Sequence, residues 1–289
     1  DFLTLSSNSA KLVLAPNLGG AIVSLDVFRV PILRSWCGNK DDLFTLASNI
    51  LVPFSNRISG GGFHWKGDYY PVKKNFVGEP FPIHGDGFQR VWDIESCSVC
   101  GAKLVLKNGN IGPFEYSASQ VFHLSEGGLK IELSLTNIGN QILPFGFGFH
   151  PWFPRNSGTK LSFKAHSVWM KDIDHLPTKL LDLQNAPNWS FKSARSLPNE
   201  FLNNGYTNWC GIALLRQELQ NLSIGLRASK NLSTVILYAP GSNSDFFCFE
   251  PVSHPINAHN LKGMPGLVAL KPSEAISSWI NLSWEFKST

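Results

Sequence analysis

The chain has 289 residues, of which 43% are hydrophobic and 16% are charged, and 25 basic against 21 acidic residues give a formal net charge of +4. This apolar content excludes a mainly disordered chain. No stretch approaches the ~18 consecutive apolar residues of a membrane-spanning helix, and the weak charge gives no basic groove for nucleic acid. We therefore expect no membrane and no nucleic-acid partner.

Short segments in which apolar and polar residues alternate recur along the chain, separated by clusters of Gly, Pro, Asn and Ser. This period of two is typical of half-buried strands, as at Leu129, Ile131, Leu133 and Leu135, and again between Ile276 and Phe286. Similar runs lie at 11–15, 20–28, 46–53, 88–96, 102–107, 117–124, 142–150, 160–164, 211–215, 221–227, 233–238 and 246–249.

No capped segment of 12 or more residues has a helical period, so the sequence predicts an all-β fold, a large antiparallel β-sandwich. No linker or change of composition divides the chain, and we expect one domain over residues 1–289. The irregular stretch 172–210 is interpreted as a long loop decorating that domain.

The segment PFGFGFHPWF, residues 144–153, carries the first candidate site residue, His150. In a strand, the phenylalanines at 145, 147 and 149 share one face, and the glycines at 146 and 148 share the other with His150. Glycine inside a strand often marks the close approach of a ligand or of another backbone. We expect an open space beside His150, and a purely structural histidine is the alternative.

In the segment DFFCFEP, residues 245–251, Glu250 follows the aromatic residues and, like His150, is itself followed by proline. Proline has no N–H to donate and favours an extended residue before it, so both side chains are expected at strand ends, on the rim of a sheet. An imidazole and a carboxylate together can serve as acid and base near neutral pH. A carboxylate in an ordinary salt bridge is the alternative for Glu250.

Other chemistry has little support in the sequence. The glycine run that follows Arg57 lacks the Gly-Lys-Ser/Thr of a phosphate loop, and the prolines around His254 prevent a helical metal motif. We expect neither a metal nor an organic cofactor. Five cysteines, an odd number, suit reduced thiols and a cytoplasmic location better than a disulfide framework.

Taken in order, several short motifs together resemble the aldose 1-epimerase (galactose mutarotase-like) family from about residue 10 to the end of the chain. The motifs are Asn56-Arg57-Ile58, Tyr70-Pro71-Val72, His84-Gly85 with Trp92, His150-Pro151-Trp152-Phe153, Gly205-Tyr206-Thr207, and Glu250-Pro251-Val252-Ser253-His254-Pro255 with Ala258 and Asn260. The resemblance implies the family's large sandwich, with a sugar cleft on one sheet. It also implies an isomerase that interconverts the α and β anomers of a hexose.

The resemblance further implies site roles. Glu250 would take the proton of the anomeric hydroxyl, and His150 would protonate the ring oxygen. His84, Arg57 and Asn56 would bind the sugar. Asn203 stands where the family usually has an aspartate that binds sugar hydroxyls, so an altered sugar preference or weak activity is expected.

Alternative functions remain at this point. One is a hexose-6-phosphate 1-epimerase, with Arg90 and Arg155 as candidate phosphate ligands. Another is a carbohydrate-binding or sensing protein without turnover. The partner expected in every case is a small-molecule sugar, bound by a monomer or homodimer, and the sequence does not identify the sugar.

Overall fold

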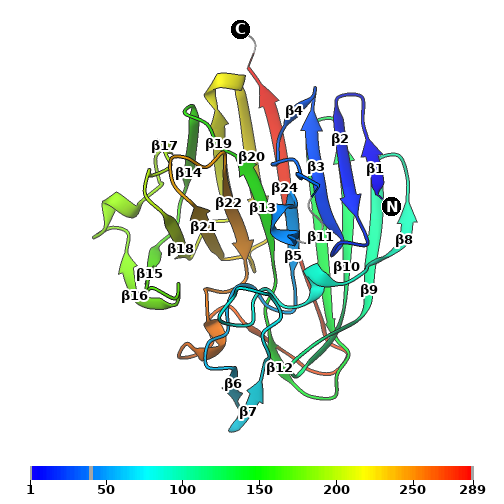
Figure 1. Ribbon diagram of the computed structural model, residues 1–289, viewed down its shortest axis with the longest axis vertical. Coiled ribbons are helices and arrows are strands. Elements are labelled where there is room, and N and C mark those ends of the chain that lie inside the picture. Colours follow the sequence, from blue (N-terminus) through cyan, green and yellow to red (C-terminus); the bar gives the residue numbers. More distant parts are fainter. Residues whose placement is uncertain (1, 39–41, 288–289) are drawn as a thin grey trace.

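The computed structural model describes residues 2–38 and 42–287, in which two large antiparallel β-sheets pack face to face (Figure 1). In spatial order the larger sheet is β1 (Leu3–Ser6), β2 (Ala10–Ala15), β3 (Ala21–Val27), β5 (Ser48–Leu51), β13 (Gly148–Pro154), β22 (Phe246–Val252), β21 (Thr234–Ala239), β18 (Leu202–Thr207), β15 (Ser167–Lys171) and β16 (Pro177–Asp182), with β4 (Val30–Pro31) paired to β3.

The second sheet runs in the order β17 (Arg195–Ser196), β14 (Thr159–Phe163), β19 (Ile212–Gln217), β20 (Leu222–Ala228), β24 (Ala275–Phe286), β11 (Gly128–Asn137), β10 (Phe114–Ser125), β9 (Gly101–Ile111) and β8 (Asp93–Cys97). Two further pairs are β6 (Gly62–Trp65) with β7 (Asp68–Pro71), and β12 (Leu143–Phe145) with β23 (Val268–Leu270). The helical turns are short 3₁₀ segments at Leu43–Thr45, Gly87–Gln89, Pro187–Trp189, Glu218–Gln220 and Ala258–Asn260.

Alternation along the strands decides which side chains fill the space between the sheets. In β11 the apolar residues from Leu129 to Leu135 are buried, while Lys130 and Glu132 between them are exposed, which confirms the predicted strand and its inward face. In β22, Phe249 packs against Phe163 of the opposite sheet, with ring centroids 5.1 Å apart. Because neighbours on a strand point to opposite faces, Glu250 projects from the outer face of the larger sheet.

The stretch 172–210 is not simply a loop, so that prediction was wrong. It contains β16, β17 and β18, and β18 is an inner strand of the larger sheet, between β21 and β15. The strand LNNGYT has few β-branched residues, and its burial rather than its intrinsic propensity keeps it extended. This strand brings Asn203 onto the sheet that carries Glu250.

An open space does lie beside His150, but Gly146 and Gly148 do not form it, which corrects that part of the expectation. A Cβ on Gly146 would lie 2.2 Å from Cδ2 of His254, and one on Gly148 would lie 2.6 Å from the Val252 side chain. Both glycines let other parts of the protein approach the chain closely. The strand is also interrupted, because β12 ends at Phe145 and β13 begins at Gly148.

We expect Gly146→Ala to lower the free energy of unfolding by about 1–3 kcal/mol, as overpacking of a filled core does. The His254 ring cannot easily move aside, because its Nε2 accepts a 3.0 Å bond from the Ser55 N–H. Urea unfolding measures the difference. Gly127→Ala is the matched control, since nothing lies within 4 Å of a Cβ there, and equal stability of the two variants would contradict the prediction.

Candidate active site

A cavity of about 320 Å³ opens on the outer face of the larger sheet, around β13, β22, β21 and β18. All six predicted site residues line it: Asn56, Arg57, His84, His150, Asn203 and Glu250. Its size lies at the lower end of the ~300–1,000 Å³ usual for ligand pockets, which suits one small polar molecule. The remaining wall is formed by Phe44, Glu79, Ile83, Trp152, His175, Phe201 and Tyr238.

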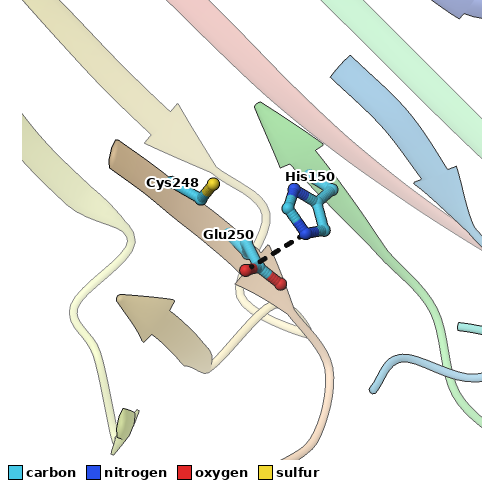
Figure 2. Close-up of side chains that lie close together, drawn as sticks. All are labelled: His150, Cys248 and Glu250. Atoms are coloured by element: carbon cyan, nitrogen blue, oxygen red, sulfur yellow. Dashed lines mark ion pairs between the residues drawn. The ribbon is translucent and has the colours of Figure 1, made fainter. Parts of the chain in front are cut away.

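His150 and Glu250 face each other from adjacent strands (Figure 2). The register pairs Gly148 with Val252 and then Trp152 with Cys248, so His150 lies opposite Glu250. The Nε2 atom of His150 is 3.3 Å from Oε1 of Glu250, and both side chains are buried.

The expectation that these two residues end their strands was wrong. His150 lies within β13 and Glu250 within β22, and both strands are central in the sheet. The pairing of β13 with β22 passes from Gly148–Val252 directly to Trp152–Cys248, and Pro151 and Pro251 lie in that gap. Proline has no N–H to donate to a neighbouring strand. Pro151 and Pro251 fit here because β13 and β22 are not paired at these two positions.

Burial sets the protonation of the pair. It raises the pKa of Glu250 well above its ordinary value, although the nearby positive charge of Arg57 lowers that pKa in part. Burial lowers the pKa of His150 to about 3. Oε2 of Glu250 and Nδ1 of His150 are buried without a hydrogen-bond partner in the protein, which is costly and needs an explanation. Both shifts favour the uncharged forms, in which Glu250 rather than His150 holds the proton that the pair can exchange.

His84 comes from a loop that lies against the 52–57 segment, through bridges between Val52 and Gly85 and between Arg57 and Ile83. The Asn56 N–H donates to Nδ1 of His84 over 3.0 Å, and the His84 N–H donates back to the Asn56 carbonyl over 3.0 Å. Since Nδ1 accepts, the ring proton must be on Nε2. Burial lowers the pKa of His84 well below its ordinary value, so a neutral imidazole offers an N–H donor.

Arg57 is held by a carboxylate that sequence analysis missed. Its Nε donates to Oε2 of Glu79 and its Nη2 to Oε1 of Glu79, each over 2.9 Å, and its Nη1 donates to Oδ1 of Asn56 over 3.3 Å. Glu79 lies in an irregular loop after β7, where no periodicity or motif marks it. Arg57 and Glu79 both line the cavity.

Asn203 reaches the cavity from β18, and aromatic rings complete its walls. The Trp152 ring stacks on His150, with centroids 5.0 Å apart and planes at 19°, because residues 150 and 152 share a face of β13. Tyr238 pairs with Asn203 across β21 and β18. Apolar ring faces beside polar groups suit a sugar, whose C–H bonds and hydroxyls alternate. Sequence reasoning did not single out Trp152, Tyr238 or Phe201 as wall residues.

A sequence model of the family described as aldose 1-epimerase matches residues 1–283. This chain belongs to the aldose 1-epimerase family. It is 33% identical to YphB of Escherichia coli K12, an uncharacterized protein, over 290 residues that cover 98% of both chains. It is 30% identical to an E. coli K12 protein assigned provisionally as an aldose 1-epimerase, whose solved structure matches with a TM-score of 0.94 over 99% of each chain.

A galactose mutarotase-like protein of Clostridium acetobutylicum has the same fold, with a TM-score of 0.86 at 19% identity over 98% of this chain and 95% of that one. The family membership and the sandwich expected from the sequence are therefore confirmed. As a family member, the protein is an isomerase, a mutarotase-like sugar epimerase. Among the described residues, no helix has the length and apolar character to cross a bilayer.

Among the residues that the structure describes, one group of side chains has the donor atoms and the spacing to hold a metal ion. It consists of His150, Cys248 and Glu250, whose candidate ligand atoms lie within 4.8 Å of one another (Figure 2). The other buried histidines near the end of β22 have structural partners. His254 bonds to the Ser55 N–H and to the Pro255 carbonyl, and Nε2 of His259 lies 2.9 Å from the Pro144 carbonyl.

We expect the epimerase to lose stability as the pH falls below 6.5. Burial lowers the pKa of His150 to about 3, of His254 to about 4 and of His259 to about 3, so the unfolded chain binds these protons and the folded one does not. The free energy of unfolding then falls between pH 6.5 and pH 4–3, by about 2 kcal/mol per histidine at pH 5. Glu250 acts in the opposite direction, but His84, whose pKa is also lowered by burial, adds to the effect of the other three histidines.

Thermal unfolding at pH 7.5 and pH 5.0 measures this loss, and a return to pH 7.5 controls for irreversible damage. A melting temperature at pH 5.0 as high as that at pH 7.5 would contradict the assignment of these histidines as buried and neutral.

Proposed function

We propose that this protein is an aldose 1-epimerase that interconverts the α and β anomers of a free, unphosphorylated hexose by acid–base ring opening. The observation that carries the proposal is the His150–Glu250 pair, 3.3 Å apart in the cavity, with one unpartnered polar atom on each side chain. A carboxyl and an imidazole that share one proton supply one acid and one base, which is what this reaction needs.

In the proposed mechanism the shared proton passes from Glu250 to His150 when the sugar binds. The Glu250 carboxylate then accepts the proton of the C1 hydroxyl while His150 donates its proton to the ring oxygen. The bond between C1 and the ring oxygen breaks, and the open aldehyde turns about the C1–C2 bond. Closure onto the other face then gives the other anomer, with both protons returned. Because the reverse reaction uses the same steps, each residue acts as acid in one half and as base in the other.

Other residues of the cavity have binding roles in this proposal. The charge of Arg57 lowers the pKa of Glu250 and so favours its ionised form. The Nε2–H of His84 is directed by the bond at Nδ1 and donates to a sugar oxygen. The His84 and His150 rings lie edge to face, with centroids 5.2 Å apart, so one oxygen near C1 can contact both. Asn56 and Asn203 offer amides for hydroxyl groups.

The two arginines considered as phosphate ligands for a hexose-6-phosphate 1-epimerase bind other parts of the protein. Arg155 donates to the carbonyls of Gly241 and Pro198, each over 2.8 Å, and Arg90 pairs with Asp86. Neither arginine lines the cavity. The arrangement therefore favours a free sugar over a sugar phosphate.

NMR exchange spectroscopy, or polarimetry on freshly dissolved sugar, tests the function on a panel of free and phosphorylated aldoses. We expect faster exchange between α and β anomers of at least one free hexose. Sugar binding by calorimetry without any acceleration across the panel would contradict an epimerase and favour a binding protein.

A further inference from the structure

Arg57 and Glu79 form an ion pair at the cavity wall. The carboxylate of Glu79 takes both N–H groups on one side of the Arg57 guanidinium, at 2.9 Å each, the bidentate geometry in which arginine binds carboxylates and phosphates. The side chains are 10% and 22% exposed. Glu79 therefore occupies the Nε–Nη2 edge of Arg57 and compensates its positive charge.

No other cation of the described cavity wall can replace Arg57. It is the only arginine or lysine among the described residues that line the cavity. The pKa values of His84, His150 and His175 are all lowered by burial, so these rings are neutral near pH 7. Lys171 lies over the Phe201 ring, 5.0 Å from its centroid, and is not part of the lining.

Glu79 also has unused acceptor capacity. A carboxylate has about four lone-pair positions, and the bonds from Arg57 occupy one on each oxygen. The partly exposed carboxylate lines the cavity and can accept hydrogen bonds from hydroxyl groups. Such bonds are charge-assisted and stronger than bonds between neutral groups.

We infer that Glu79 is a specificity-determining residue: it binds hydroxyls of a neutral aldose and, by occupying Arg57, excludes sugars that carry a phosphate or carboxylate. The inference rests on the proposed function and assigns a role to a residue outside the acid–base pair. An anionic sugar would meet an arginine whose charge is already compensated, and it would either displace Glu79 from Arg57 or lie beside the Glu79 carboxylate. A neutral sugar meets neither cost.

The test compares wild type with Glu79→Gln, which keeps the shape of the side chain and removes its charge. NMR exchange rates give kcat and KM for glucose, glucose 6-phosphate and glucuronate, or for the free hexose that the panel identifies and its anionic derivatives. For the neutral sugar we expect KM to rise about tenfold with kcat nearly unchanged, the effect of losing one charge-assisted bond. For the anionic sugars we expect KM or the inhibition constant to fall about tenfold, because Arg57 is free to bind them.

Two further variants make the result specific. Glu218→Gln removes a carboxylate that pairs with Lys160 over 2.7 Å on the other sheet, and it should leave both preferences unchanged. In the double variant Arg57→Gln with Glu79→Gln, the gain for anionic sugars should disappear. If the role of Glu79 were purely structural, Glu79→Gln would weaken the binding of neutral and anionic sugars alike.

A Glu79→Gln variant that keeps the wild-type ratio of neutral to anionic sugar would overturn the inference. That result is distinct from a failure of the proposed function. If wild type accelerates no anomer exchange, the epimerase proposal fails, and calorimetric binding of the same sugars to wild type and Glu79→Gln still decides the role of Glu79.

Discussion

Glu250→Gln is expected to slow enzymatic anomer exchange by about 10²–10⁴-fold, the usual contribution of a positioned acid or base. Glutamine keeps the size of the side chain and can still accept a hydrogen bond, but it cannot take up the proton of the C1 hydroxyl. The loss should appear in kcat, with little change in KM. Saturation-transfer NMR at equilibrium measures it, after subtraction of the spontaneous exchange rate. Glu115→Gln, an exposed carboxylate on β10, is the control.

The same substitution should stabilise the protein, which separates loss of chemistry from loss of fold. Because burial raises the pKa of Glu250 above its ordinary 4.5, the folded chain binds this proton more tightly than the unfolded chain does. The free energy of unfolding therefore falls as the pH rises from about 4.5 toward the raised pKa. Glutamine has no such dependence, so the variant should melt higher than wild type at pH 8 and more nearly equal to it at pH 5. Exchange within a few-fold of wild type would remove Glu250 from the mechanism.

Local patterns were enough to predict much of the sandwich. Alternation at Leu129–Leu135 identified a strand and its buried face, because the side-chain period of a strand is two. It was less informative for β18, whose sequence LNNGYT has the composition of a turn but is held by its neighbours β15 and β21. Burial of that strand is a tertiary effect, which a local pattern does not contain.

For the candidate site too, the sequence identified most of the residues but not the contacts between them. Local patterns singled out His150 and Glu250, the family resemblance added roles for these two and for Arg57 and His84, and the structure brings all four to one cavity. Their opposition could not follow from spacing, since the register of β13 against β22 joins segments a hundred residues apart. No motif or periodicity in the sequence marks Glu79. Its contact with Arg57 depends on a loop that folds back onto that residue.

Prolines and glycines were interpreted from general tendencies, and these tendencies gave the wrong local picture. Proline after His150 and after Glu250 suggested strand ends, yet both residues lie inside central strands where the ladder opens. Gly146 suggested room for a ligand, but the imidazole of His254 fills that room. The prolines lie where the two strands are not paired, and the space above Gly146 is filled by another side chain. Both depend on the neighbouring segment, which the local sequence does not identify.

His150→Ala is the second substitution with a large expected effect, again about 10²–10⁴-fold in the exchange rate, because it removes the group that we propose protonates the ring oxygen. The stronger test is the double variant with Glu250→Gln. If the two residues move one shared proton across the sugar, either single change already disables the step, and the double variant should be little slower than the slower single variant. Independent roles would instead multiply the two losses. His64→Ala, which changes an exposed residue of β6, controls for removal of an imidazole. Multiplicative losses in the double variant would contradict the shared-proton mechanism, because each residue would then contribute without the other.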